Sequence, residues 1–173
     1  MNKDLFYYSI AEIGISIIIG ISILFLTYKL IDILVKKRYN IKIDNISYSI
    51  FSSSVLFSVA YLISGIKAPI LKSLRMITDN PRYDGYYLID GLKYTFIFLL
   101  IIVITIALVN FISIKLFIVM TKNVSEFEEI SKNNIAVSIL TATIIICISL
   151  LVKDSLYLLL DSFVPYPQTP RFN

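Results

Sequence analysis

The sequence contains no histidine and no tryptophan, and it has a single cysteine, Cys147. These absences exclude Cys/His metal sites, Ser-His-Asp and Cys-His catalytic groups, and any intrachain disulfide bond. Charged residues are also scarce, at 16% of the chain compared with about 25% in soluble domains. The side chains left for chemistry are carboxylates, Lys, Ser and Tyr, and no base and nucleophile can be assigned within reach of each other. We therefore expect no enzymatic activity, no bound metal and no cofactor.

Apolar side chains are correspondingly abundant, since 57% of the 173 residues are hydrophobic and the mean hydropathy is +0.82. A soluble domain of this length has too little interior to bury them. Four runs reach the roughly 20 apolar residues needed to cross about 30 Å of hydrocarbon: 10–35, 46–66, 94–114 and 133–152. The first run contains Glu12, Lys29 and Asp32 near its ends, and the other three contain no charged residue. The sequence therefore predicts an all-α integral membrane protein of four helices.

The segments outside these runs differ in character. Residues 36–42 form a short and densely basic loop. The connection 67–93 is longer, and it contains apolar residues at helical spacing: Ile70, Leu71, Leu74 and Ile77. This spacing predicts a short amphipathic helix on the membrane surface, outside the hydrophobic core. The tail, 165–173, contains three prolines and is predicted to be extended.

The chain matches itself when it is shifted by 89 residues. Asp44-Asn45-Ile46 then meets Asn133-Asn134-Ile135, and small residues of the second run coincide with small residues of the fourth. The first and third runs match at a shift of 86 residues. We therefore predict a single domain built from two repeated transmembrane hairpins, 5–66 and 94–164. Both hairpins insert in the same orientation, so a pseudo-twofold axis along the membrane normal should relate them.

The coinciding small residues predict where helices pack. In lipid, small side chains let helix backbones approach, and hydroxyl groups form hydrogen bonds between helices. The predicted helix-packing stripe consists of Ser47, Ser54, Ser58, Thr143 and Cys147. Because Cys147 aligns with Ser58, we interpret it as a packing residue and not as a reactive thiol.

Short motifs at the starts of the second and fourth runs resemble the YjfL-like family of small bacterial inner-membrane proteins of unknown function. The matching residues are Glu126-Phe127-Glu128-Glu129-Ile130, Asn133-Asn134-Ile135-Ala136-Val137-Ser138 and Asn45-Ile46-Ser47-Tyr48-Ser49. The resemblance covers about residues 10 to 160. It implies four spans built as two repeated hairpins in a bacterial inner membrane, and it brings no enzymatic activity. The chain departs from the family pattern in using Ser where the family tends to use Gly.

Four polar residues are candidates for a polar path or for contacts between helices: Glu12, Asn45, Asn110 and Asn134. Asn45 is either a helix cap or a polar lining residue. Ser125-x-x-Glu128 forms a capping box upstream of Asn134, which predicts that Asn134 lies inside a helix and faces another helix. Glu12 is either a functional membrane carboxylate or an interfacial residue in the first helical turns.

The basic loop supplies four candidate anchors to anionic lipid headgroups: Lys36, Lys37, Arg38 and Lys42. The acidic group Glu126, Glu128 and Glu129 is a possible ion-pair partner for this loop, within one chain or between subunits. The membrane topology divides the 16 Lys and Arg residues equally between the two sides. The density of positive charge in the basic loop favours a cytoplasmic position for it, with both termini extracytoplasmic.

These observations favour a non-enzymatic multipass membrane protein that acts through helix association. It would be a homo-oligomer or a subunit of a larger membrane complex. The alternative is a small transporter or ion channel with a polar path between the two repeats. The expected partners are membrane lipids and either a second copy of the chain or another membrane protein, and no nucleic acid is expected.

Overall fold

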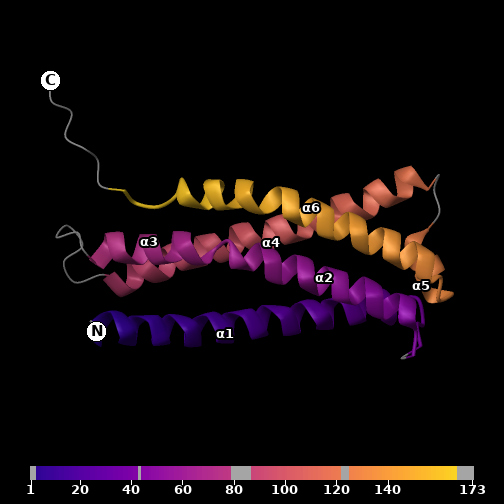
Figure 1. Cartoon of the computed structure of the whole chain (residues 1–173), viewed down its shortest axis with the longest axis horizontal. Coiled ribbons are helices and arrows are strands. Elements are labelled where there is room, and N and C mark those ends of the chain that lie inside the picture. The colour runs from indigo at the N-terminus through magenta and orange to yellow at the C-terminus, as the bar shows by residue number, and fades with distance from the viewer. Residues whose placement is uncertain (1–2, 43, 79–86, 122–124, 167–173) are drawn as a thin grey trace, which may run out of the picture.

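Figure 1 shows the computed structural model of the chain, which describes residues 3–42, 44–78, 87–121 and 125–166. All regular structure in these residues is helical. The elements are α1 (Lys3–Ile31), the π-helical turn η1 (Asp32–Lys36), α2 (Ile46–Ser64), α3 (Lys67–Thr78), α4 (Tyr87–Met120), α5 (Glu126–Ser131) and α6 (Ile135–Asp161). Helices α2 and α6 both start at the end of the molecule where α5 lies, and they run in the same direction (Figure 1). This parallel course is the one expected for two parallel hairpins, and the duplication itself remains a prediction.

Three segments of the described residues are helical, long enough and apolar enough to cross a membrane: Ile46–Ser73, Gly91–Met120 and Ile135–Asp161. They overlap the second, third and fourth runs of the sequence. Helix α1 covers most of the first run, and its crossing of a membrane remains a prediction. The last segment continues past the predicted limit at Val152, so Lys153 and Asp154 belong to α6 and do not follow it. By the length and composition of these helices, the chain is a membrane protein.

The segment Ile46–Ser73 contains a break, because α2 ends at Ser64 and α3 begins at Lys67. Pro69 lies in the first turn of α3 and has no N–H to donate to the carbonyl of Gly65, so a continuous helix would lose a hydrogen bond there. The N–H of Gly65 instead bonds to the carbonyl of Leu62 at 3.1 Å, which tightens the last turn of α2. Helix α3 then continues along the bundle beside α4 (Figure 1).

The amphipathic helix predicted after the second run is therefore present as α3. Its Ile77 is 1% exposed and Ile70 is half-buried, and the helix packs on α4 and α6. Part of the face that was predicted to lie on lipid is thus covered by protein. The following Asp79-Asn80-Pro81-Arg82-Tyr83-Asp84-Gly85, whose composition is typical of a turn, lies outside the described residues.

The centre of the bundle is α2, which packs against α1, α4 and α6 and has its most extensive interface with α6. Large apolar side chains point outward from the neighbouring helices, including Ile18 and Phe25 on α1 and Phe96 on α4. Several serines are instead buried between the helices. Those buried in the described helices are Ser47, Ser52, Ser54, Ser58, Ser73, Ser113, Ser138 and Ser149. Apolar exteriors with small polar residues between helices are typical of proteins surrounded by lipid.

Candidate functional site

The start of α2 is fixed by the side chain of Asn45, which is 5% exposed. As the N-cap, its Oδ1 accepts a hydrogen bond from the N–H of Tyr48 at 2.7 Å. Its Nδ2 donates to the carbonyl oxygens of Ile130 and Ser131, at 2.8 and 3.3 Å. These carbonyls belong to the last turn of α5, where they have no partner within the helix. The Asn45 side chain therefore provides hydrogen-bond partners for a backbone N–H in the first turn of α2 and for backbone carbonyls in the last turn of α5.

The start of α6 carries the equivalent cap. The Oδ1 of Asn134 accepts a hydrogen bond from the N–H of Val137 at 3.4 Å, and its Nδ2 donates to Glu129 Oε2 at 2.8 Å. The prediction that Asn134 lies inside a helix is therefore wrong. Ser125 does occupy the N-cap position of α5, but its side chain makes no capping hydrogen bond. The helix that starts there is short and ends before Asn134.

Asn133 explains why α5 and α6 are separate helices. Its φ of 62° lies in the left-handed region, which Asn tolerates better than most residues. The N–H of Asn133 bonds to the carbonyl of Ile130, and the N–H of Asn134 bonds to the carbonyl of Glu129, both at 3.0 Å. This pair of bonds is the Schellman pattern that ends helices. The Oδ1 of Asn133 accepts a further hydrogen bond from the N–H of Ser47 at 3.0 Å. We call Asn45, Asn133, Asn134 and Glu129 the asparagine cluster.

Glu129 brings a charge into this cluster. Its carboxylate accepts hydrogen bonds from Asn134 and, at 2.9 Å, from the ammonium group of Lys132. The bond from Asn134, assisted by Lys132, holds the pKa of Glu129 below its usual range. The hydrogen bond that Lys132 donates to Glu129 raises the pKa of Lys132. The asparagine cluster therefore joins α2, α5 and α6 with neutral caps and one ion pair.

The middle of the α2–α6 interface carries the predicted small-residue stripe in part. Ser47, Ser54 and Ser58 are buried on α2, as expected for packing residues. The hydroxyls of Ser58 and Ser149 share a hydrogen bond of 2.6 Å between the two helices.

Thr143 and Cys147 are exposed on α6, so the prediction that they pack in this interface is wrong. Helix α6 contacts α2 through Ser149, which is two residues beyond Cys147. Two residues correspond to a rotation of about 200° around a helix, since each residue turns it by about 100°. The repeat alignment places Cys147 at the level of Ser58, but on the side of α6 that α2 does not cover.

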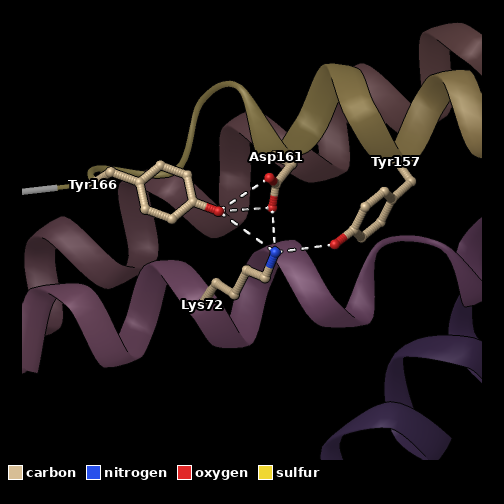
Figure 2. Close-up of polar contacts among 4 residues, drawn as sticks. All are labelled: Lys72, Tyr157, Asp161 and Tyr166. Carbon is tan, nitrogen blue, oxygen red and sulfur yellow. Dashed lines mark hydrogen bonds and ion pairs between the residues drawn. The ribbon is translucent and has the colours of Figure 1, made fainter.

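A second polar cluster lies near the opposite end of the bundle (Figure 2). Lys72 of α3 places its Nζ 2.8 Å from Asp161 Oδ1 and 3.0 Å from the hydroxyl of Tyr157, both on α6. Tyr166, beyond the end of α6, donates its hydroxyl to Asp161 at 3.0 Å and lies 3.5 Å from the Lys72 ammonium. We call these four residues the lysine clasp. It ties α3, α6 and the start of the tail together, and the tail beyond Tyr166 lies outside the described residues.

The lysine clasp was not predicted from the sequence. The only available signal is that Lys72 and Asp161 are 89 residues apart, which is the repeat shift, and carry opposite charges. Residues at equivalent positions in two parallel hairpins lie at the same level of the bundle. A search for complementary charges at that spacing would have found this pair.

Lys153 packs against an aromatic ring. Its Nζ lies 4.1 Å from the centre of the Tyr61 ring, and its stem passes Gly65 at the break after α2. Asp154 is exposed, and no ion pair of the described residues joins it to Lys153. The cation lies against an aromatic face, which offsets part of its desolvation cost.

The basic loop starts with a local ion pair. Lys36 lies 3.4 Å from Asp32 and over the ring of Tyr48, whereas Lys37, Arg38 and Lys42 are exposed. Within the described part of the chain, no ion pair joins this loop to the acidic residues of α5. The predicted role of the loop as a headgroup anchor is untested.

The candidate polar path is only partly brought together. Asn45 and Asn134 share the asparagine cluster. Asn110 lies in α4, and its Nδ2 donates to the carbonyl of Ile106 at 2.8 Å, within its own helix. The Glu12 side chain lies outside the described part of the structure. Among the described residues, no group of three His, Cys, Asp or Glu side chains could hold a metal ion.

The helices and their polar contacts define a helical membrane protein in which buried caps, serines and one lysine clasp join the segments. The chain belongs to the family described as Domain of Unknown Function (DUF350), whose model matches residues 4–156. No curated protein and no solved structure matches the chain. Membership of a family of unknown function over nearly the whole chain is therefore confirmed, while the resemblance to the YjfL-like proteins remains a prediction.

Proposed function

We propose that the protein is a non-enzymatic membrane protein that acts by helix association and forms a homo-oligomer. The observation that supports this proposal is the exposed small-residue face of α6. Thr143 and Cys147 lie on that face, whereas Ser54 and Ser58, their counterparts at the repeat shift of 89, are buried against a helix. The small residues of α2 are thus covered by another helix of the same chain, whereas the corresponding small residues of α6 are not covered.

Lipid covers such a face less well than a second helix does. Small residues let two backbones approach, and the hydroxyl of Thr143 can bond across the contact. We propose a second copy of the chain as the occupant, since a symmetric pair of α6 helices buries the same face twice. We further propose that the protein lies in a bacterial inner membrane with both termini extracytoplasmic, as the dense basic loop favours.

Cys147 allows a direct test because it is the sole cysteine of the chain. Mild oxidation of the protein in its own membrane should give a disulfide-linked dimer, because a disulfide forms only when two Cα atoms approach within about 7 Å. The Cys147→Ser variant should give no such dimer. Failure to cross-link, together with a monomeric mass in gentle detergent, would overturn the proposal.

A bulky substitution provides the second arm of the test. Cys147→Phe should weaken the dimer without unfolding the chain, because the residue is exposed in the monomer. Val103→Phe is the matched control, since Val103 is 54% exposed on α4, outside the proposed face of α6. Equal weakening by both variants would argue against the small-residue face as the contact.

The alternative function, a small transporter or channel, is favoured by one observation. The Oδ1 of Asn110 is buried without a hydrogen-bond partner in the most apolar segment of the chain. Solute or ion flux in proteoliposomes that is lost in Asn110→Leu would support this function. If Asn110→Leu assembles normally and neither this variant nor the unmodified protein shows flux, the transporter function is excluded.

A further inference from the structure

Helix α5 carries three glutamates in three different surroundings. Glu128 is exposed, and Glu129 is held by Asn134 and Lys132. Glu126 is 2% exposed, and its Oε2 is buried without a hydrogen-bond partner. A buried ionised carboxylate with an unpaired oxygen is costly, whereas the protonated acid is neutral and needs much less solvation. A hydrogen bond from the backbone of Glu126 favours the ionised form, but burial outweighs it. The burial of Glu126 therefore favours a bound proton.

Within the described part of the chain, the charges around Glu126 do not compensate for its burial. Lys115 of α4 is the opposite charge that acts on it, but Lys115 is exposed, lies against the Phe111 ring and forms no ion pair of the described residues. From the loop after η1, Tyr39 faces α5 and packs its ring on Phe127. The halves of α2 and α6 that begin beside α5 contain no charged residue. Burial outweighs the lysine and raises the pKa of the Glu126 carboxyl.

The position of Glu126 links its charge to the docking of α5. The next residue, Phe127, packs against Phe51 of α2 with ring centres 5.7 Å apart. At the other end of α5, Asn45 of α2 binds the carbonyls of Ile130 and Ser131. These contacts place α5 on the start of α2, with the carboxyl of Glu126 enclosed.

We propose that Glu126 is a proton-binding site that controls the docking of α5 on the start of α2. The docked structure is the protonated state. Loss of the proton leaves a carboxylate that must reach water, and α5 then loosens from α2. The group stabilises the docked state below its unfolded pKa, and this stabilisation is lost as the pH rises through the raised folded pKa.

The absence of tryptophan from the chain makes the test simple. In Phe127→Trp, the single indole reports the packing of α5 against Tyr39 and Phe51. Its emission should shift to longer wavelength as the pH rises from the acid range to above neutrality, because the carboxyl then loses its proton. Adding Glu126→Gln, which mimics the protonated acid, should remove the shift. Adding Glu128→Gln on the exposed side of the same helix should leave it unchanged.

A measurement without the reporter protects the test against a poorly folded tryptophan variant. The thermal midpoint of the unmodified chain in detergent should fall over the same rise in pH relative to that of Glu126→Gln, and the two should converge at low pH. Parallel midpoints for the two proteins, or a shift that Glu128→Gln removes equally, would overturn the proposal. Both outcomes are independent of the oligomeric state proposed above.

Discussion

Helices α2 and α6 start alike and end differently. Each begins with an asparagine whose Oδ1 binds the amide three residues later, Tyr48 in α2 and Val137 in α6. Helix α6 then continues without interruption to Asp161, whereas α2 ends at Ser64. The two helices are alike where their polar sequences match.

The difference between their ends has a local cause. At the repeat shift of 89 residues, Gly65 and Pro69 of the first copy correspond to Asp154 and Leu158 of the second. Proline removes a backbone donor, so α3 forms as a separate helix that the Lys72–Asp161 pair ties back to α6. A few residues thus convert one long helix into two pieces, and the lysine clasp ties the second piece to α6.

The largest predicted loss of stability distinguishes the cap of α2 from the cap of α6. Asn45→Ala removes both a cap and a buried bond to the end of α5, and we expect a loss of about 2–4 kcal/mol in the free energy of unfolding. Asn134→Ala removes a longer capping bond at a more exposed site and should cost about 1 kcal/mol. Denaturant titration in detergent checks both values. Equal losses would mean that the contact between α2 and α5 contributes nothing.

The lysine clasp should act on α3 alone. Lys72→Met should make the amides of α3 exchange hydrogen several-fold faster while those of α6 keep their rates. Asp161→Asn should have the same effect, and the double variant should add little, because the two residues act as one unit. Lys67→Met at the exposed start of α3 is the matched control. Additive effects in the double variant would show that the clasp is not a coupled pair.

The smallest effect should identify the cause of the break after α2. Gly65→Ala should change stability by no more than about 0.5 kcal/mol, because the added Cβ meets the Lys153 stem at 3.6 Å, an ordinary contact. Pro69→Ala restores the missing N–H and should slow hydrogen exchange across residues 65–69. A break that closes in Gly65→Ala and persists in Pro69→Ala would assign the cause to glycine.

Composition and periodicity were sufficient to predict three of the helices that are apolar enough to cross a membrane. The cap at Asn45 was one of two roles left open for that residue. The break between α5 and α6 was missed because the capping box at Ser125 predicts a start without indicating how far the helix runs. The left-handed Asn133, which ends α5, has no sequence signature that distinguishes it from a helical asparagine.

The packing sides of the helices were harder to predict than their positions. Ser47, Ser54 and Ser58 are buried, but Thr143 and Cys147 are exposed although they align with the same stripe. Sequence repetition fixes the level of a residue along the bundle. Which side of α6 is covered depends on where α2 and α4 lie around it, and a single sequence does not carry that information.

Native mass spectrometry of the protein extracted gently from its own membrane tests the central proposal most directly. Association through helices predicts a defined multiple of the 19.7 kDa chain, or a complex whose mass requires another membrane protein. The Cys147→Phe variant should shift a homo-oligomer toward the monomer, and Val103→Phe should not. A monomer without any partner, in lipid-like conditions that preserve other oligomers, would contradict the proposal.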